Sequence, residues 1–470
     1  MIPENIKEVL QQLNQSGYEA YIVGGAVRDM VLNVEPHDWD ITTNAKPDEI
    51  KKVFNKTIDT GLKHGTVTAV VNKEQFEITT YRIDGDYTDG RHPDKVEFTT
   101  DLIEDLKRRD LTINAMACDI DGNIIDPFNG QKDLENHIIR AVGKAENRIQ
   151  EDALRMLRAI RFSAKLGFEI DSELKQAISD NAKSINKISE ERIESELTKI
   201  ITSDNPEKII DLYELGVTKY ILPEFDKMME CEQHSPWHLY NVGMHSVKAM
   251  ENVPKDKILR WTMLLHDVGK PDSKTTTNGI DHFLNHNFKS ENIADDILTR
   301  LKFSNVDKKE ILELIVQHDM HPQKEAKIRK FVSLHTPKFI EDLKLVQLAD
   351  MSAQSNYKID EKMNTFNKMF DTCDEIINNG TIITLKTLQI NGNDLQKIGF
   401  KGKEIGEVLN QFVTQAYGQP SINNKEKLLK MAQNIYNKKH KNLDDIIDNA
   451  TKSYNDDNIN KEDINRGESR

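Results

Sequence analysis

The spacing of apolar residues divides the chain into a β-rich part and a longer helical part. Residues 18–140 alternate short apolar, β-branched runs with turns, which is typical of strands. From about residue 145 to 440, apolar residues recur at three- and four-residue intervals, which is typical of helices. The expected strands cover residues 18–23, 38–42, 66–71, 76–81, 96–98 and 117–120. The pattern predicts an α+β chain, with a small mixed sheet followed by several helical regions.

Two aspartates follow a glycine turn near the start of the β-rich part. The strand 18–23 leads into Gly24 and Gly25, a short helix is expected next, and the following strand carries Asp38 and Asp40. Residues two apart on a strand point to the same face. Two carboxylates would therefore lie side by side and could hold a pair of Mg²⁺ ions.

The glycine turn is suited to phosphate, because a helix start offers unpaired N–H groups. Gly24 and Gly25, together with Arg28, would bind a triphosphate, although Arg28 could instead form a surface pair with its neighbour Asp29. Glu77 interrupts an apolar strand and is a candidate third catalytic carboxylate, with a solvated strand face as an equal alternative. A phosphate site beside a metal-binding pair predicts nucleotidyl transfer.

Residues 151–162 place arginines at every third position. Arg155, Arg158 and Arg161 would share one helical face, and Asp152 is expected one turn before Arg155. Aspartate accepts from an exocyclic amino group and arginine donates to a ring nitrogen or carbonyl. The pair of Asp152 and Arg155 could therefore read the edge of cytosine or adenine. A structural ladder of salt bridges is the alternative.

Charge and cysteine content limit the class of protein. The 470 residues carry a net charge of −14, so any nucleic-acid surface must be local. The three cysteines are far apart in sequence, which indicates a reducing compartment without a disulfide framework. Neither a signal peptide nor a membrane-spanning apolar run is expected. We expect a cytoplasmic protein with no membrane partner.

Five segments in the first half of the chain carry ordered motifs. They are Gly24-Gly25-Ala26-Val27-Arg28-Asp29 with Asp38-x-Asp40, Arg108-Arg109-Asp110, Asp126-Pro127-Phe128-Asn129-Gly130 with Asp133-Leu134, Glu151-Asp152-x-x-Arg155-x-x-Arg158, and Ser189-x-x-Arg192-x-x-x-Glu196. Together they resemble the motifs of class II tRNA nucleotidyltransferases and poly(A) polymerases, over about residues 15–225. The resemblance implies a polymerase-β-like nucleotidyltransferase head, a helical neck, and template-free addition of C, C and A to tRNA from CTP and ATP.

The resemblance also implies roles for individual residues. It makes Asp38 and Asp40 the metal-binding pair, Gly25 and Arg28 phosphate binders, Arg109 a sugar or phosphate contact, Asp152 and Arg155 the base-reading pair, and Arg158 and Arg161 further nucleotide contacts. Residues 82–93 resemble the flexible loop that members adding a complete CCA retain. Members that add only A, and poly(A) polymerases, share the motifs and stay open as alternatives.

A second set of histidines and aspartates provides nitrogen and oxygen ligands for a divalent metal. The set consists of His245, His266, Asp267 and Asp350. It resembles the HD phosphohydrolase superfamily over about residues 235–355, and His286 and His318 could serve a second metal. The resemblance implies a divalent transition metal (Ni, Mn, Co or Fe) and attack of activated water on a phosphoester. A vestigial domain that only grips tRNA is the alternative.

Near the end of the chain, residues 391–395 and 399–406 carry glycines and lysines before a helix. They resemble the tRNA-contacting tail of HD-bearing CCA enzymes. The expected domains are the nucleotidyltransferase head (1–140), the helical neck that binds nucleotide and RNA (141–230), the HD domain (231–375), a C-terminal tRNA-binding helical module (376–440) and a disordered tail (441–470).

Template-free CCA addition to tRNA is therefore the leading hypothesis, with an HD phosphohydrolase activity as an implied addition. The first alternative is a poly(A) polymerase or an enzyme that adds only A. The second is an HD phosphohydrolase whose head serves as an RNA-binding module, which the intact pair of Asp38 and Asp40 argues against. The sequence does not indicate an oligomeric state.

Overall fold

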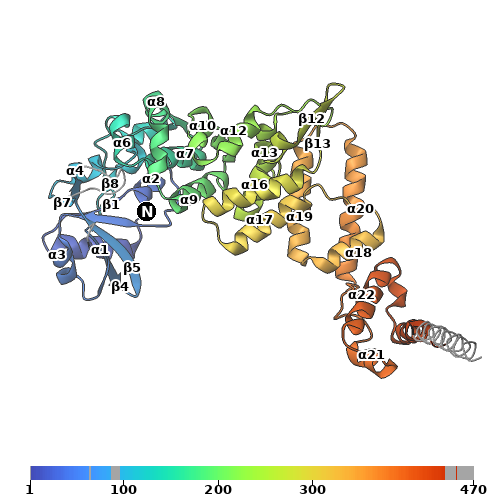
Figure 1. Cartoon of the computed structure of the whole chain (residues 1–470). Helices are drawn as coiled ribbons and strands as arrows, with labels where there is room; N and C mark the ends of the chain where they lie inside the picture. The colour runs from blue at the N-terminus through green and yellow to red at the C-terminus, as the bar shows by residue number, and fades with distance from the viewer. Residues whose placement is uncertain (1, 63–64, 86–95, 440–450, 452–470) are drawn as a thin grey trace, which may run out of the picture. The chain divides into compact units, whose positions relative to one another are not determined.

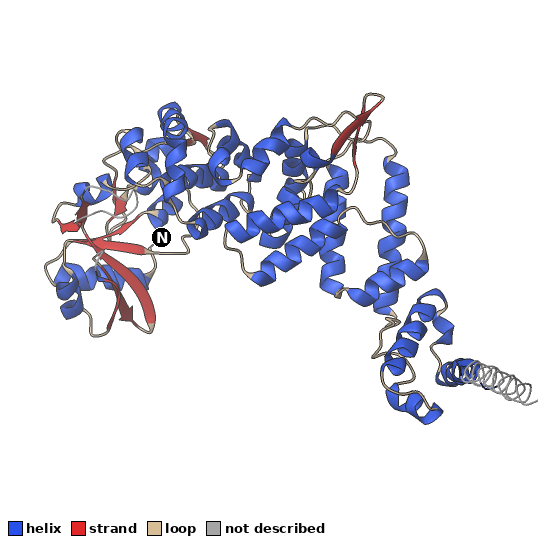
Figure 2. Cartoon of the chain, in the orientation of Figure 1, coloured by secondary structure: helices blue, strands red, loops and turns tan. Residues whose placement is uncertain are grey.

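The computed structural model describes residues 2–62, 65–85, 96–439 and 451. The chain forms two compact units, the first comprising Met1–His318 with Leu345–Tyr357 and the second Asp319–Lys344 with Lys358–Arg470. A mixed sheet lies in the first unit and helices make up most of the remainder (Figures 1 and 2). The predicted α+β class is confirmed.

A seven-stranded mixed sheet forms the head, in the order β3-β4-β5-β2-β1-β8-β9. Its strands are β1 (Ala20–Val23), β2 (Asp40–Thr43), β3 (Thr57–Gly61), β4 (Thr66–Val71), β5 (Glu74–Thr80), β8 (Ala117–Cys118) and β9 (Ile124–Ile125). Neighbouring strands pair antiparallel except β2 and β5, which are parallel. β6 (Arg82–Asp84) and β7 (Val96–Phe98) form a separate antiparallel pair.

The strand containing the two aspartates is shorter than predicted. β2 begins at Asp40, so Asp38 lies in the preceding loop. The argument that both carboxylates share a strand face is therefore wrong for Asp38. The helices of the head are α1 (Glu4–Gln15), α2 (Gly25–Val31), α3 (Pro47–Val53), α4 (Leu102–Lys107) and α5 (Gly130–Glu135), with a 3-10 turn, η2, at Thr112–Asn114.

The neck is helical, as its periodicity predicts. Leu154, Leu157 and Ile160 form the buried stripe of α7. Gly167 caps the end of this helix, and its positive φ of 70° suits glycine. The helices are α6 (Ala145–Glu151), α7 (Leu154–Leu166), α8 (Ser172–Asn181), α9 (Glu190–Ile201), α10 (Ile209–Glu214), α11 (Thr218–Ile221) and α12 (Pro223–Glu230), with short parallel strands β10 (Ile138–Ile139) and β11 (Glu169–Ile170).

The next helices surround a buried cluster of histidines and aspartates. They are α13 (Val242–Glu251), α14 (Lys257–Leu265), α15 (Lys270–Ser273), α16 (His286–Arg300), α17 (Asn305–Gln317) and the end of α19 (Pro337–Ser352). A hairpin follows α15, formed by β12 (Lys274–Thr277) and β13 (Ile280–Phe283). Asn278 and Gly279 both have positive φ, as a tight hairpin turn requires.

Two helices join the neck to this region within the first unit. The indole N–H of Trp261 on α14 donates to Thr198 Oγ1 on α9 at 2.9 Å. Lys257 Nζ, at the start of α14, lies 2.9 Å from Glu194 Oε1 on α9. Trp261 is fully buried, so these contacts hold α14 firmly against α9.

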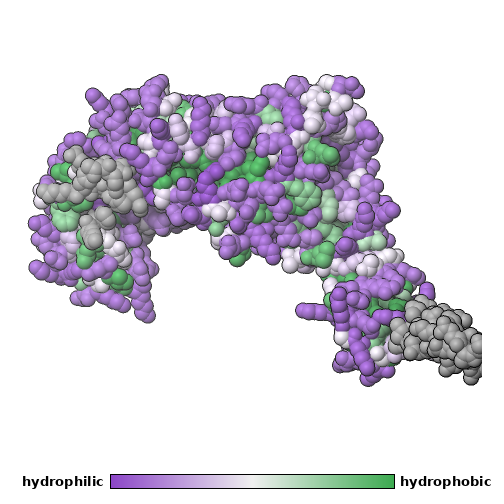
Figure 3. Space-filling model, viewed as in Figure 1, coloured by the Kyte–Doolittle hydropathy of each residue, from purple (hydrophilic) through white to green (hydrophobic). Residues whose placement is uncertain are grey.

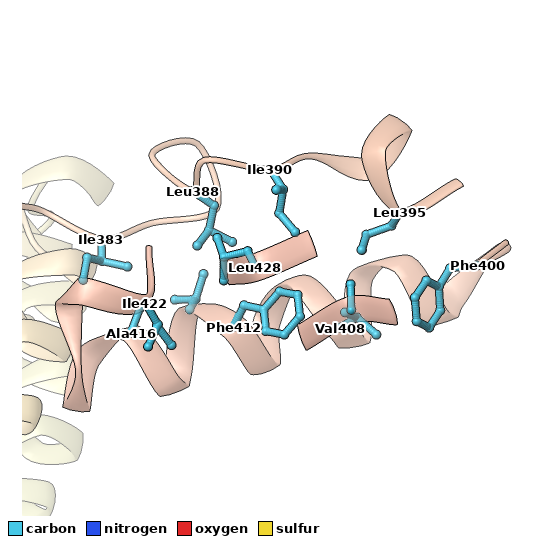
Figure 4. Packing of buried hydrophobic residues seen from close by; sticks show 12 residues of the cluster. Ile383, Leu388, Ile390, Leu395, Phe400, Val408, Phe412, Ala416, Ile422 and Leu428 are labelled. Atoms are coloured by element: carbon cyan, nitrogen blue, oxygen red, sulfur yellow. The ribbon is translucent and has the colours of Figure 1, made fainter. Parts of the chain in front are cut away.

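The second unit is helical, with α18 (Glu325–Leu334), α20 (Ile359–Asn378), α21 (Gly392–Ile398), α22 (Lys403–Gly418) and the 3-10 turn η5 (Pro420–Ile422). Leu395, Phe400, Phe412 and Leu428 meet in an apolar core that holds α21 and α22 together with the helical residues 425–439 (Figure 4). Of the two glycine-bearing segments predicted to precede a helix, residues 391–395 form the start of α21 itself, and residues 399–406 lead into α22.

Residues 86–95, which include most of the expected flexible loop, lie outside the described residues, as does the expected disordered tail apart from residue 451. The five predicted domain boundaries stay predictions. Among the described helices, none combines the length and apolar content needed to cross a bilayer. The face shown in Figure 3 is mainly hydrophilic, in line with the mean hydropathy of −0.62.

Candidate functional site

A polar pocket of about 340 Å³ opens where the head meets the neck. The head contributes the glycine turn and the start of β2, and the neck contributes residues of α7 and α9. Six arginines and three aspartates dominate the lining, so the pocket suits a polyanion. The lining residues are Gly24, Gly25, Arg28, Asp40, Arg108, Arg109, Asp110, Asn114, Asp152, Leu154, Arg155, Arg158, Phe162 and Arg192.

Gly24 brings the backbone close to two charged side chains. Its φ of 71° and ψ of −129° are rarely available to other residues. A Cβ at Gly24 would lie 3.2 Å from Arg109 Nη1 and 3.7 Å from Asp40 Oδ2. At Gly25 the nearest atom would be Arg28 Nη2, at 3.6 Å, which is an ordinary contact. Gly24 is therefore the position where only glycine fits.

Asp40, at the start of β2, lies beside Glu77, in the middle of the neighbouring strand β5. Ile41 pairs with Ile78 in the parallel register of β2 and β5, so the residues just before them are neighbours on the opposite face. Desolvation raises the pKa of Asp40, Arg109 opposes this effect, and Asp38 adds to it. Asp38 is therefore close enough to act electrostatically on Asp40, although it is exposed and does not line the pocket.

Arg28 is almost fully buried, with 3% exposure. Its Nε donates to Asp29 Oδ1 at 2.8 Å, as the surface-pair alternative expected, but Nη1 donates to Asn114 Oδ1 at 2.8 Å inside the pocket wall. Burial lowers the pKa of Arg109, which Asp105 opposes from 3.6 Å. These partners hold both cations at the glycine turn.

Asp152 lies at a break between two helices, so its predicted position on the arginine helix is wrong. α6 ends at Glu151, Asp152 is extended, and α7 starts at Leu154. Asp152 Oδ1 accepts from the Leu154 N–H at 2.9 Å, and Oδ2 accepts from Arg192 Nη2 at 3.2 Å. The partner of Asp152 is therefore Arg192 on α9 and not Arg155, although both arginines line the same pocket.

Each of the three arginines on α7 has a carboxylate partner. Arg155 pairs with Glu151, which precedes it by one turn. Arg158 Nε donates to Asp110 Oδ2 at 2.6 Å. Arg161 lies 2.6 Å from Glu196 Oε2 on α9. The salt-bridge ladder considered as the alternative is thus present, and two of its arginines, Arg155 and Arg158, also line the pocket.

The structure brings together eight of the sequence-predicted residues in one pocket: Gly24, Gly25, Arg28, Asp40, Arg109, Asp152, Arg155 and Arg158. Asp38, Glu77 and Arg161 do not line it. Sequence reasoning listed none of Arg108, Asp110, Asn114, Phe162 and Arg192 as a site residue, and it placed Leu154 only in the helix core. Arg108, Asp110 and Arg192 belong to the quoted motifs, which was the available signal. Nothing in the spacing distinguished Phe162 from an ordinary core residue.

The second set of predicted residues forms a buried cluster. His245 Nε2 lies 2.8 Å from Asp350 Oδ1 and 3.5 Å from Asp267 Oδ2. His266 Nε2 lies 3.3 Å from Asp267 Oδ2. The structure therefore brings His245, His266, Asp267 and Asp350 together, from α13, the end of α14 and α19.

His286 and His318 complete a second group around the same aspartate. Asp267 Oδ1 lies 3.3 Å from His286 Nε2 and 3.8 Å from His318 Nε2. The two carboxylate oxygens of Asp267 thus face different histidines. Lys270 Nζ is 2.7 Å from Asp267 Oδ2, which supplies the cluster with a fixed positive charge.

Three of the histidines present the same nitrogen to the cluster. Nδ1 of His266, His286 and His318 lies 2.8, 2.9 and 2.6 Å from a backbone carbonyl. An imidazole that donates from Nδ1 has its Nε2 lone pair available for a metal. His266 Nε2 and both oxygens of Asp267 are buried without a hydrogen bond. This donor set fits a divalent transition metal.

Buried charges shift the pKa values in this cluster. Burial alone would lower the pKa of His266, but the charges of Asp267 and Asp350 raise it. Burial alone would raise the pKa of Asp267, but His266 and Lys270 hold it well below the usual range. A ligand set that is anionic at Asp267 and Asp350 attracts a cation strongly.

Family models match three stretches of the chain. Residues 20–140 match the Poly A polymerase head domain, residues 167–229 match the probable RNA and SrmB-binding site of polymerase A, and residues 238–353 match the HD domain. The matches confirm both resemblances seen in the sequence.

Two relatives of this chain are CCA-adding enzymes. A CCA-adding enzyme of Lactobacillus johnsonii is 57% identical over 205 residues, which is 44% of this chain and 52% of that protein. The match thus spans about half the length of that relative. A CCA-adding enzyme of Ligilactobacillus salivarius is 35% identical over 93% of this chain and 98% of its own length.

The crystal structure of the Bacillus stearothermophilus CCA-adding enzyme in complex with CTP matches with a TM-score of 0.70 and 28% identity. The match covers 94% of this chain and 100% of that structure. With the similarity to the Ligilactobacillus salivarius protein over nearly its full length, the chain belongs to the family of CCA-adding enzymes.

Proposed function

We propose that the protein adds C, C and A to the 3′ end of tRNA, using CTP and ATP without a template. The observation that carries this proposal is the pocket that joins Asp40 and the glycine turn of the head to the arginines of α7. Such a pocket supplies a metal-binding carboxylate and phosphate-binding cations at one place. The relatives are CCA-adding enzymes, which favours this reaction over the alternatives.

Asp38 and Asp40 would hold Mg²⁺, with Glu77 as a third carboxylate beside Asp40. The bound metal would lower the pKa of the attacking 3′-hydroxyl and neutralise the leaving pyrophosphate. The backbone at Gly24 and Gly25 would approach the triphosphate. The buried Arg28 and the partly exposed Arg109, both in the pocket wall, would donate to its oxygens.

Asp152 and Arg155 would select the nucleotide. Both line the pocket, and an ionised carboxylate beside a guanidinium can pair with the amino group and the adjacent ring acceptor of cytosine or adenine. Uracil offers a carbonyl where these bases carry the amino group. Arg158 and Arg161 would make further nucleotide contacts, Arg161 from outside the described pocket wall. A cytoplasmic location stays a prediction.

Three RNA substrates test the function. The full-length protein is incubated with tRNA lacking CCA, tRNA ending in CC, and an unrelated RNA, with CTP and ATP separately and together. Limited completion to CCA on both tRNAs supports the proposal. Long A tails would instead identify a poly(A) polymerase, and addition to the CC-ending tRNA alone would identify an enzyme that adds only A. No incorporation on any RNA would leave the head as an RNA-binding module.

The cluster around Asp267 supports a second candidate function, a metal-dependent phosphohydrolase. His245, His266, Asp267 and Asp350 would hold a divalent transition metal that activates water against a phosphoester. Titration with Mn²⁺, Co²⁺ or Ni²⁺ should show binding that Asp267→Ala abolishes and that the exposed hairpin variant His282→Ala retains. Phosphatase and cyclic phosphodiesterase assays then test turnover. Metal binding without turnover would favour a domain that only grips tRNA.

A further inference from the structure

Phe162 is an aromatic side chain that contacts three arginines, of which Arg28 and Arg158 line the pocket. Phe162 lies on α7, is 6% exposed and lines the pocket. The guanidinium carbons of Arg161, Arg28 and Arg158 lie over its ring, at 4.2, 5.1 and 5.7 Å from the centroid. No other aromatic ring in the described part of the chain has more than one cation over it.

These arginines come from two parts of the fold. Arg28 belongs to α2 in the head, whereas Arg158 and Arg161 belong to α7 in the neck. Each is fixed on one side by its own carboxylate: Asp29 for Arg28, Asp110 for Arg158 and Glu196 for Arg161, all at 2.6 Å. Phe162 is the side chain that all of them share.

Three guanidinium groups around one side chain repel one another. Burial is the largest effect that lowers the pKa of Arg161, and the charges of Arg158 and Arg28 lower it further, against the opposing effect of Glu196. An aromatic face attracts each cation, because the ring face carries partial negative charge. The ring therefore offsets part of the repulsion without neutralising the positive charge, as a further carboxylate would do.

We propose that Phe162 is a positioning residue for nucleotide binding: its ring keeps Arg28, Arg158 and Arg161 in a fixed arrangement before the triphosphate enters. This inference rests on the proposed binding of nucleotide in the pocket. The side chain needs no contact with the nucleotide, because it acts through the guanidinium groups. Prearranged cations bind a polyanion more tightly, since less ordering is needed at binding.

The test uses substitutions at position 162 that distinguish the effect of the aromatic ring from the effect of filling the same apolar volume. Phe162→Leu and Phe162→Met fill the site but lack the ring, whereas Phe162→Tyr retains it. Phe168→Leu is the matched control, because Phe168 is also buried in the neck, with 5% exposure. Its ring packs against the ring of His137, with 4.7 Å between the ring centroids, and not against an arginine. Each full-length variant is titrated with CTP and with ATP, and KM and kcat are measured on tRNA lacking CCA.

Leu and Met at position 162 should weaken CTP and ATP binding and raise both KM values by about tenfold, with a much smaller effect on kcat. Tyr at position 162 and Leu at position 168 should bind as the wild type does. If the Leu variant does not fold, the Met variant provides the same measurement.

Wild-type affinity in the Leu or Met variant, or equal losses in the Tyr or Phe168 variants, would overturn the positioning role. A wild-type protein that binds neither CTP nor ATP would instead overturn the proposed function itself.

Discussion

Arg192 on α9 donates to Asp152, which lies at the break between α6 and α7, across 3.2 Å. Residues 40 positions apart thereby form one wall of the pocket. The second oxygen of Asp152 accepts from the N–H of Leu154, so the carboxylate is fixed at both ends. An ionised, oriented carboxylate can accept a hydrogen bond from a base amino group. Because Arg192 on α9 holds the Asp152 carboxylate in place, we expect Arg192 to affect which nucleotide is selected.

Replacing Arg192 should therefore loosen that selection. In Arg192→Ala, Asp152 loses a charge-assisted hydrogen bond of about 1.5–3 kcal/mol, and we expect discrimination of CTP and ATP against UTP to fall by about tenfold. The measurement compares kcat/KM for the three nucleotides. Arg300→Ala is the control, because Arg300 pairs with Glu224 at 2.9 Å outside the pocket. Unchanged discrimination would exclude this role.

Asp38 and Asp40 should be needed for chemistry and not for RNA binding. Asp40→Ala or Asp38→Ala should lower the rate of nucleotide addition by about 10³-fold or more, since metal ions supply several kcal/mol of transition-state stabilisation. Affinity for tRNA, measured by filter binding, should stay close to wild type. Asp59→Ala removes a surface carboxylate on β3 that pairs with Lys51 and should leave both properties unchanged. Normal turnover in either aspartate variant would refute the metal site.

Gly24 and Gly25 should differ sharply in their tolerance of alanine. Gly24→Ala forces a side chain into a strained conformation with Arg109 Nη1 at 3.2 Å, at a cost of about 1–3 kcal/mol. We expect kcat/KM for CTP to fall by about tenfold or more. Gly25→Ala meets only an ordinary contact at 3.6 Å and serves as the matched control. Equal effects of the two substitutions would show that the backbone strain at Gly24 is unimportant.

Asp281 should make the β12–β13 hairpin sensitive to acid. The hydroxyl of Thr276 and the N–H of His234 donate to its carboxylate, and Lys274 lies 3.0 Å away. The Thr276 hydrogen bond is the largest of the effects that together hold the pKa of Asp281 below its usual range. A carboxyl whose pKa is lower in the folded state stabilises that state above the unfolded pKa of about 4. This stabilisation is lost as pH falls further, through the folded pKa.

Hydrogen exchange of peptides covering 231–240 and 274–284 measures this effect. At pH 7, Asp281→Asn should increase local opening, and its difference from the wild type should shrink as pH falls below about 4. Asp272→Asn, near the hairpin but without such partners among the described contacts, should match the wild type. A difference that is constant with pH would contradict the electrostatic explanation.

The sequence by itself determined the α+β class, the glycine turn with its aspartates and the two candidate centres. These features depend on local periodicity and on residue types that few other roles require. The periodicity of α7, for example, correctly placed Leu154, Leu157 and Ile160 in the core, because a helical period of 3.6 fixes which positions share a face.

Only the tertiary structure decided which charges meet. Local spacing suggested Arg155 as the neighbour of Asp152, yet α9 brings Arg192 to it, and packing of head against neck surrounds Phe162 with three guanidinium groups. It also limited β2 to Asp40–Thr43, which leaves Asp38 in a loop. Charges and rings act through distances across the fold, and sequence separation carries little information about those distances until the elements pack.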